Sequence, residues 1–187
     1  TDTGGVTLGK PTASYDVSVQ STDIEITAGG TYELTGSSTE RSVIVKTTDP
    51  VTLVLDNLTM ERDKSPIQLQ GSANVTLVLK AGTTNSITCT ALKVTVTHDE
   101  IITVPPTEDG GEETTETVTV PGNDGMTAGI NVPENATLTI TKVKDETAGA
   151  LTVQGGYGGA GIGGGAALPQ YIEQYAESGK NGNGGGN

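Results

Sequence analysis

A repeat of short strand-like segments constrains the fold of this chain more than any other feature. Ile24 and Ile26 alternate with polar residues, and a glycine turn separates them from a second alternating pair, Tyr32 and Leu34. Alternation with period two is typical of half-buried β-strands. Later copies of the first strand begin at Val43, Ile67, Ile130 and Leu151. Most successive copies therefore start about 19 to 24 residues apart, which predicts the coils of a parallel β-solenoid.

The composition agrees with a narrow aliphatic core. The 187 residues include five Tyr but no Phe and no Trp, while Val, Ile and Leu occupy the alternating positions and Thr the positions between them. Bulky rings are hard to place between thin stacked coils, and β-branched Thr is suited to strands. We therefore expect an all-β fold, and we disfavour an immunoglobulin-like sandwich because such domains usually have a buried aromatic anchor.

Residues 97–125 interrupt the repeat. Two Thr- and Val-rich stretches, Ile101–Val104 and Thr117–Val120, flank the acidic segment Pro105–Glu116. Their mirrored ends, ITVPP and VTVPG, predict an antiparallel hairpin inserted into one coil. This hairpin is either a solvated insertion or a lateral contact surface.

The last part of the chain, residues 154–187, is rich in glycine. One short helix is predicted at Pro169–Glu177, because Pro suits a first helical turn and Gly179 follows the end. The predicted organisation is a lead-in or cap over residues 1–22 and one β domain over residues 23–187.

The charge balance restricts the partners. Ten Lys and Arg stand against 23 Asp and Glu, which gives a net charge of −13. Such a surface repels nucleic-acid phosphates and anionic lipid, whereas it suits divalent cations. Apolar runs are too short for a membrane-spanning helix, and the single Cys89 cannot form an internal disulfide.

Residues that could perform catalysis are few. His98 is the only histidine, so a nucleophile–base pair of the hydrolase type is disfavoured. The glycines of Gly159–Gly164 match a dinucleotide fingerprint, but the alternation of strands and helices that would support it is missing. Arg62 lies among Glu61, Asp63 and Lys64, a mixture that fits either a lyase or a solvated turn.

Acidic and amide side chains at turns are candidate calcium ligands. Hard cations prefer several oxygen ligands and tolerate irregular turns. The predicted ligands are Asp56, Asn57, Asp63, Asn123 and Asp124.

Tyrosines are the only candidates for aromatic platforms that stack on sugar rings. Tyr171 and Tyr175 would share one face of the predicted helix, and Tyr157 lies in the preceding glycine-rich loop. Either these three bind carbohydrate, or they pack the short helix onto the solenoid.

Several phrases of the sequence carry a family resemblance when taken in order. GGTYELTG, VTLVLDNLTM, SANVTLVLKAGTTNSIT and AGINVPENATLTITK are followed by GAGIGGG. Over Asp23–Thr90 and Ala128–Gly165 the chain resembles the secreted β-helical carbohydrate-binding domains of bacteria. The resemblance implies a right-handed parallel β-helix, calcium at polar turns and non-catalytic binding of an acidic polysaccharide such as pectin. The inserted hairpin is longer than expected for this family.

The sequence as a whole predicts an extracellular or cell wall-associated module that binds polysaccharide, serves adhesion, uses calcium and performs no chemistry. One alternative is a structural subunit that associates through the ends of its solenoid into a surface fibre or stalk. A second alternative is a polysaccharide lyase.

Overall fold

The computed structural model describes residues 4–91, 98–104, 114–120 and 127–164. Apart from one turn of 3-10 helix, η1 (Val17–Val19), its regular elements are all β-strands. The chain divides into two compact units, one formed by Thr1–Leu92, Met126–Ala166 and Gly185–Asn187, the other by Lys93–Gly125 and Ala167–Gly184. No helix in the described part of the chain has the length and apolarity to cross a membrane.

The larger sheet of the first unit is entirely parallel. Five strands follow one another in it: β1 (Ala13–Asp16), β3 (Gly30–Ser38), β5 (Val51–Arg62), β7 (Asn74–Leu79) and β12 (Thr137–Lys142). Two more strands, β8 (Thr84–Cys89) and β13 (Ala150–Gln154), continue it from the second half of β5.

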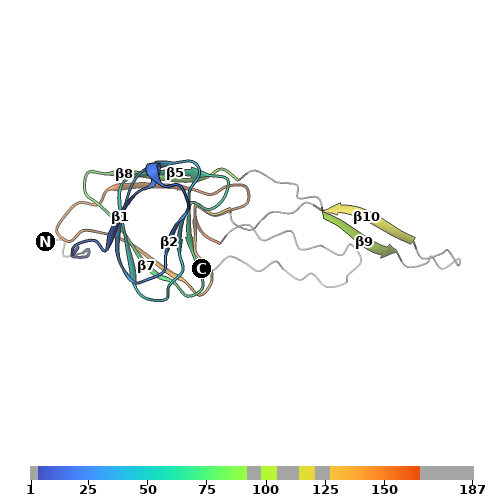
Figure 1. Ribbon diagram of the computed structural model, residues 1–187, viewed down its shortest axis with the longest axis horizontal. Coiled ribbons are helices and arrows are strands. Elements are labelled where there is room, and N and C mark those ends of the chain that lie inside the picture. Colours follow the sequence, from blue (N-terminus) through green and yellow to red (C-terminus); the bar gives the residue numbers. More distant parts are fainter. Residues whose placement is uncertain (1–3, 92–97, 105–113, 121–126, 165–187) are drawn as a thin grey trace. The chain divides into compact units, whose positions relative to one another are not determined.

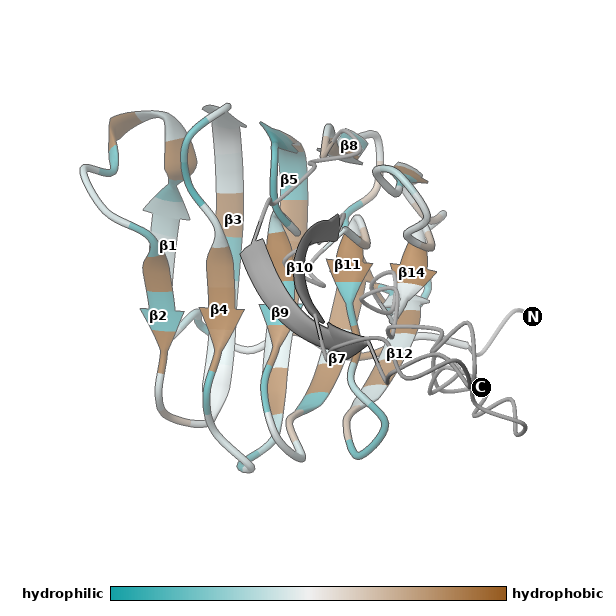
Figure 2. Ribbon diagram, turned by 90° about the vertical axis from the view of Figure 1, so that its right-hand side faces the viewer, coloured by the Kyte–Doolittle hydropathy of each residue, from teal (hydrophilic) through white to brown (hydrophobic). Residues whose placement is uncertain are grey.

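A second parallel sheet takes the strands that lie between these in the chain (Figure 2). Its members are β2 (Ile24–Ile26), β4 (Val43–Val45), β6 (Ile67–Leu69), β11 (Ile130–Asn131) and β14 (Ile162–Gly163). The chain thus makes five passes, each contributing to both sheets: β1 and β2; β3 and β4; β5 and β6; β7, β8 and β11; β12, β13 and β14. Figure 1 looks along the axis on which the passes stack, so that successive passes lie one behind another.

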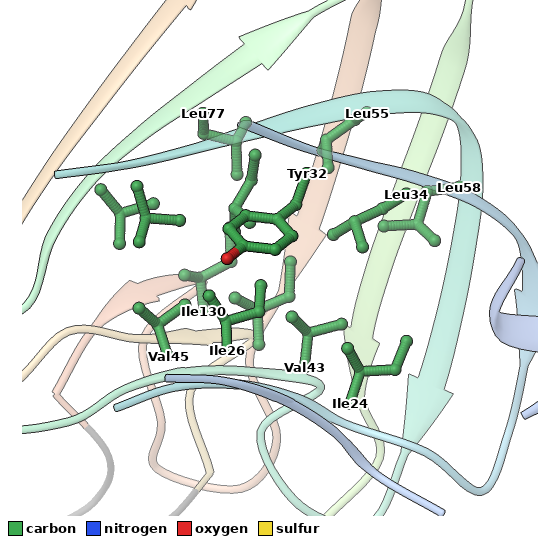
Figure 3. Close-up of a cluster of buried hydrophobic side chains, with 14 of the residues drawn as sticks. Ile24, Ile26, Tyr32, Leu34, Val43, Val45, Leu55, Leu58, Leu77 and Ile130 are labelled. Atoms are coloured by element: carbon green, nitrogen blue, oxygen red, sulfur yellow. The ribbon is translucent and has the colours of Figure 1, made fainter. Parts of the chain in front are cut away.

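The core lies between the two sheets. Its side chains stack on one another because equivalent residues of successive passes stand in register. Leu34 pairs with Leu55, and Leu55 pairs with Leu79. In the other sheet Val43 lies between Ile24 and Ile67. Figure 3 shows side chains of both sheets pointing toward one another, and nearly all of them are fully buried.

One tyrosine ring is buried in this core, although bulky rings were expected to be hard to place there. Tyr32 is buried, its hydroxyl donates to the carbonyl of Ala28 (2.9 Å), and its ring stacks on Tyr15 with centroids 6.4 Å apart. Tyr32 pairs with Ala13, and Tyr15 pairs with Leu34, so the two rings meet diagonally across neighbouring strands, which is within the reach of aromatic side chains. Phe and Trp are absent, but a narrow core does not exclude every ring.

Pairing between β3 and β5 is irregular at one point, and buried polar groups stabilise it. Asn57 has a φ of 54° and no partner in β3, and Gly36 beside it has a φ of 88°. The fully buried Asn85 accepts a hydrogen bond from the N–H of Leu58 (2.9 Å) and donates to the carbonyl of Ala150 (3.1 Å). Asn85 therefore connects three passes where the ladder of backbone bonds is interrupted.

The predicted first strands are found at Ile24, Val43, Ile67 and Ile130, which begin β2, β4, β6 and β11. The prediction for Leu151 is wrong, because Leu151 lies in β13 of the larger sheet, and Ile162 is the residue that pairs with Ile130. The last pass inserts an additional strand before it returns to the second sheet. An all-β fold with parallel sheets is confirmed.

The second unit contains β9 (His98–Val104) and β10 (Thr114–Val120), an antiparallel pair as the mirrored ends predicted. The strands are longer than expected, so that Val120 pairs with His98 and Val104 with Thr114. The predicted helix Pro169–Glu177 lies outside the described residues. The predicted domain boundaries stay predictions.

Candidate functional site

A polar groove with a volume of about 510 Å³ opens where the chain leaves the larger sheet. Its walls are the side chains of Thr39, Glu40, Arg41, Glu61, Arg62, Asp63 and Thr90. Both arginines of the chain are among them. The groove therefore gathers the chain's entire supply of guanidinium groups beside three carboxylates.

The parallel register brings these distant segments together. Residues 39–41 directly follow β3, residues 61–63 include the end of β5, and Thr90 directly follows β8. Ser38 pairs with Met60, and Arg62 pairs with Cys89, so the three segments belong to neighbouring passes. The groove consequently crosses three passes of the stack.

Arg62 is anchored from behind by the two passes that precede it. Its Nη1 donates to Asp23 Oδ1 (2.7 Å) and to Ser42 Oγ (2.8 Å). Asp23 also accepts the N–H of Ser42 (2.9 Å), while Ser42 Oγ donates to the carbonyl of Ser65 (3.1 Å). The Arg62 side chain is only 20% exposed. A guanidinium has five donors, so this anchoring fixes the group and leaves further donors for the groove.

Arg41 is held by backbone and by its neighbour. Its Nε donates to the carbonyl of Gln20 (3.2 Å), and its Nη2 lies 3.2 Å from Glu40 Oε2. The two arginines thus have different settings. Arg62 belongs to a partly buried polar network, whereas Arg41 is tied to an exposed carboxylate.

Tyr157 lies next to this groove on the following pass. Its N–H donates to the carbonyl of Ala91 (2.7 Å), the residue after Thr90. Its side chain is 55% exposed. The structure therefore places the backbone of Tyr157 near the groove and leaves the residue accessible, while its role in binding carbohydrate stays a prediction. Tyr171 and Tyr175 lie outside the described residues.

The predicted calcium ligands Asp56 and Asn57 serve other contacts. Asp56 Oδ2 pairs with the ammonium of Lys80 (2.5 Å), and its Oδ1 accepts from the Asn57 amide (3.0 Å). Lys80 also pairs with Glu33 (3.0 Å). The hydrogen bond to Asp56, followed by that to Glu33, raises the pKa of Lys80 above 10.5. A cation at Asp56 would have to displace this ammonium, so the site as built does not fit calcium.

Asp63 does not join Asp56 and Asn57 in a common cluster. It is 81% exposed and lies in the groove, 3.9 Å from Arg62 Nε. Asn123 and Asp124 lie outside the described residues. Within the described ranges, no three His, Cys, Asp or Glu side chains gather in a way that could hold a metal ion. Calcium binding stays a prediction.

Sequence reasoning did not assemble the groove, although a signal was present. The sequence placed Arg62 only within its own turn, and it gave no reason to join Arg41 to it. These residues are one repeat apart, and equivalent positions of a parallel repeat stack on one another. Asp23 and Ser42 could not be assigned as anchors of Arg62, because their contacts depend on side-chain directions at the turns.

The fold and the groove together define an all-β module of parallel strands with an open polar groove. A family model described as "Carbohydrate-binding domain-containing protein" matches residues 20–104. This range includes every residue that lines the groove, as well as Asp23 and Ser42 behind it. Comparisons with curated proteins and with solved structures give no match.

Proposed function

We propose that this protein is a non-catalytic carbohydrate-binding module whose site is the groove around Arg41 and Arg62, with Tyr157 beside it. One observation carries the proposal: all the residues that line this polar groove fall within the range that the carbohydrate-binding family model matches. The module is the right-handed parallel β-helix that the sequence resemblance implies, and it acts outside the cell or on the cell wall.

The groove has the chemistry that a sugar requires. Each sugar hydroxyl both donates and accepts, and the groove offers guanidinium donors, carboxylate acceptors and the hydroxyls of Thr39 and Thr90. An exposed tyrosine ring adds an apolar face with a polar edge. Polar groups beside one aromatic surface are typical of sites that bind small polar ligands.

The spacing of the passes suits an extended glycan. Neighbouring parallel strands are ~4.8 Å apart, so the three steps from the pass of Arg41 to that of Tyr157 cover about 14 Å. A linear oligosaccharide lying along the stack would contact each pass in turn. The site therefore binds the interior of a polysaccharide chain rather than a single sugar.

The setting of Arg62 supports binding over catalysis. A lyase needs a group that accepts a proton, whereas a guanidinium is a donor without an acceptor atom, and that of Arg62 already pairs with Asp23 at 2.7 Å. Arg62 can therefore orient a ligand but is a poor base.

The test uses calorimetry of the whole chain with a panel of soluble plant and bacterial polysaccharides. Tyr157→Ala and Arg41→Ala should each weaken binding about 10-fold or more, because Tyr and Arg are the residue types that contribute most often to binding energy at interfaces. Lys46→Ala is the matched control, because Lys46 is a paired surface cation outside the groove. Absence of binding to every glycan would refute the proposal, and so would equal affinity of the groove variants and the control.

An association through the end of the stack is a second candidate function, supported by exposed apolar residues on the last pass. Ile140 and Ile162 line two cavities of about 380 and 570 Å³ at that end. Exposed apolar patches often mark contact surfaces. Light scattering across a concentration series tests this alternative: Ile140→Lys should abolish any oligomer, and a monomer at all concentrations would exclude it.

A further inference from the structure

We infer that the groove selects a neutral, hydroxyl-rich glycan and discriminates against polyuronates. This inference rests on the proposed function, since it specifies the ligand of the same site. It differs from the sequence-based prediction of an acidic polysaccharide bridged by calcium. The charges around the two arginines are the reason.

The groove is negative in spite of its arginines. Its two guanidinium groups are opposed by three carboxylates, those of Glu40, Glu61 and Asp63. A fourth carboxylate, Asp23, lies directly behind Arg62. The rest of the chain adds to the same sign, with a net charge of −13. A polyuronate carries one carboxylate on each sugar and would meet this field along its whole length.

Neither arginine offers an unpaired charge to a ligand carboxylate. Arg62 is already neutralised by Asp23 at 2.7 Å, and Arg41 by Glu40 at 3.2 Å. An incoming carboxylate would have to share or displace these partners. A neutral hydroxyl needs only a free N–H or a free oxygen lone pair, and the anchored groups still provide both.

The exposed carboxylates act as acceptors for sugar hydroxyls and as a barrier to anions. Glu40 is 73% and Asp63 81% exposed, so both reach the solvent where a ligand approaches. Hydroxyl donors to a carboxylate form stronger hydrogen bonds than those to a neutral acceptor, whereas like charges in an interface are repulsive. The same two residues thus favour one ligand class and disfavour the other.

Asp23 is a positioning residue in this scheme. It does not line the groove, yet it binds both Arg62 and the backbone of Ser42. Asp23→Asn should keep the shape of the contact and remove the charge. We expect it to loosen Arg62 and to reduce the preference for neutral ligands.

The experiment compares pairs of ligands that differ only in charge. Uronate oligosaccharides and their methyl esters are titrated in a calorimeter against the whole chain, with a neutral series of cello-, xylo- and manno-oligosaccharides alongside. Each titration is run with chelator and with added calcium. We expect the best neutral ligand to bind about 10-fold or more tightly than any uronate in chelator. Added salt should narrow this gap, because screening weakens the repulsion.

The double variant Glu40→Gln, Asp63→Asn tests whether the two exposed carboxylates cause the selectivity. Both side chains are highly exposed, so the fold should tolerate the change, and circular dichroism verifies it. We expect this variant to bind uronates about 10-fold better than the parent chain, with a smaller change for neutral glycans. Asp23→Asn should also raise the affinity for uronates relative to that for neutral glycans.

The outcomes separate this inference from the function on which it rests. Equal or tighter binding of uronates, with or without calcium, would overturn the selectivity but leave carbohydrate binding intact. Binding of no glycan at all would overturn both. Neutral selectivity that the double variant does not change would also refute the inference, because the carboxylates would then not be its source.

Discussion

The first and last passes of the stack carry similar residues but bury them differently. Ile26 on β2 is 1% exposed, whereas Ile140 on β12 is 43% and Ile162 on β14 is 41% exposed. All three belong to the apolar positions of parallel strands. The difference shows that burial here depends on what lies beyond a strand as much as on the type of residue.

The first pass is closed by its own chain. After β1, the chain forms η1, and Val17 of η1 is buried in the core. Asp16 caps this turn by accepting the N–H of Ser18 (3.0 Å). Hydrogen bonds from the Ser18 side chain and backbone hold the pKa of Asp16 below 3.8. The described residues provide no comparable turn over the last pass.

The N-terminal segment connects the two ends. Val6 bridges Val143, next to the end of β12, and the N–H of Thr12 donates to Thr31 in β3 (2.6 Å). Five residues lie between Val6 and Thr12, and the six steps from one to the other allow at most ~20 Å of extended chain. Four strand spacings of the larger sheet are ~19 Å. The segment must therefore run nearly straight from the last pass to the first.

The largest difference in the free energy of unfolding is expected when the same substitution, Ile→Ala, is made in the first pass and in the last. Ile26→Ala should lower the free energy of unfolding by about 3 kcal/mol, because it leaves a cavity in a closed core. Ile140→Ala should lower it by about 1 kcal/mol or less, because a partly exposed side chain loses little on truncation. Urea unfolding followed by circular dichroism measures both. Equal losses would contradict the difference in burial between the ends.

A smaller effect is expected where the N-terminal segment joins the last pass. Val6→Pro removes the N–H that donates to Lys142 (2.9 Å) and should cost about 1–2 kcal/mol. Gly9→Ala is the control, since a Cβ at Gly9 meets no atom within 4 Å. Thermal unfolding and hydrogen exchange of β12 report the outcome. If Val6→Pro behaves like Gly9→Ala, the segment does not stabilise the last pass.

The smallest loss of stability is expected for a substitution in the middle of the stack, with which the losses at the two ends can be compared. Lys80 bridges Asp56 and Glu33 across three passes but is 42% exposed, so Lys80→Met should cost about 0.5 kcal/mol at pH 7. Because folding raises the pKa of Lys80, the ammonium contributes fully below pH 10.5 and its contribution is lost as the pH rises through the higher folded pKa.

The melting temperatures of the parent chain and Lys80→Met should therefore differ at pH 7 to 9 and converge in strong alkali. Lys46→Met provides the comparison, because Lys46 pairs with one carboxylate, Glu25, whereas Lys80 pairs with two. A difference that persists unchanged at alkaline pH would show that Lys80 acts through packing and not through its charge.

Much of the fold could be predicted because the signal is local. Alternation at Ile24, Val43 and Ile67 indicates strands, and their spacing indicates parallel pairing. The fifth copy was misplaced at Leu151 because alternation identifies a strand but not the sheet that receives it. Only the register, with Ile162 opposite Ile130, makes that assignment.

The candidate site was less accessible to prediction. Tyr157 could be proposed because aromatic residues are scarce in this chain, and the structure leaves its ring exposed. Asp56 was proposed as a calcium ligand from the amide beside it, yet Lys80, 24 residues later, occupies its carboxylate. Partners one pass away are invisible to any argument about neighbours in the sequence.

The sequence by itself determined the strand-forming segments, the aliphatic character of the core and the acidity of the surface, because each depends on residue type and on spacing within one repeat. Tertiary structure decided which passes lie next to one another, how Asp23 and Ser42 anchor Arg62, and that both arginines open into one groove. The physical reason is that these contacts join residues about 20 to 40 positions apart, through a register that backbone hydrogen bonds across the whole stack establish.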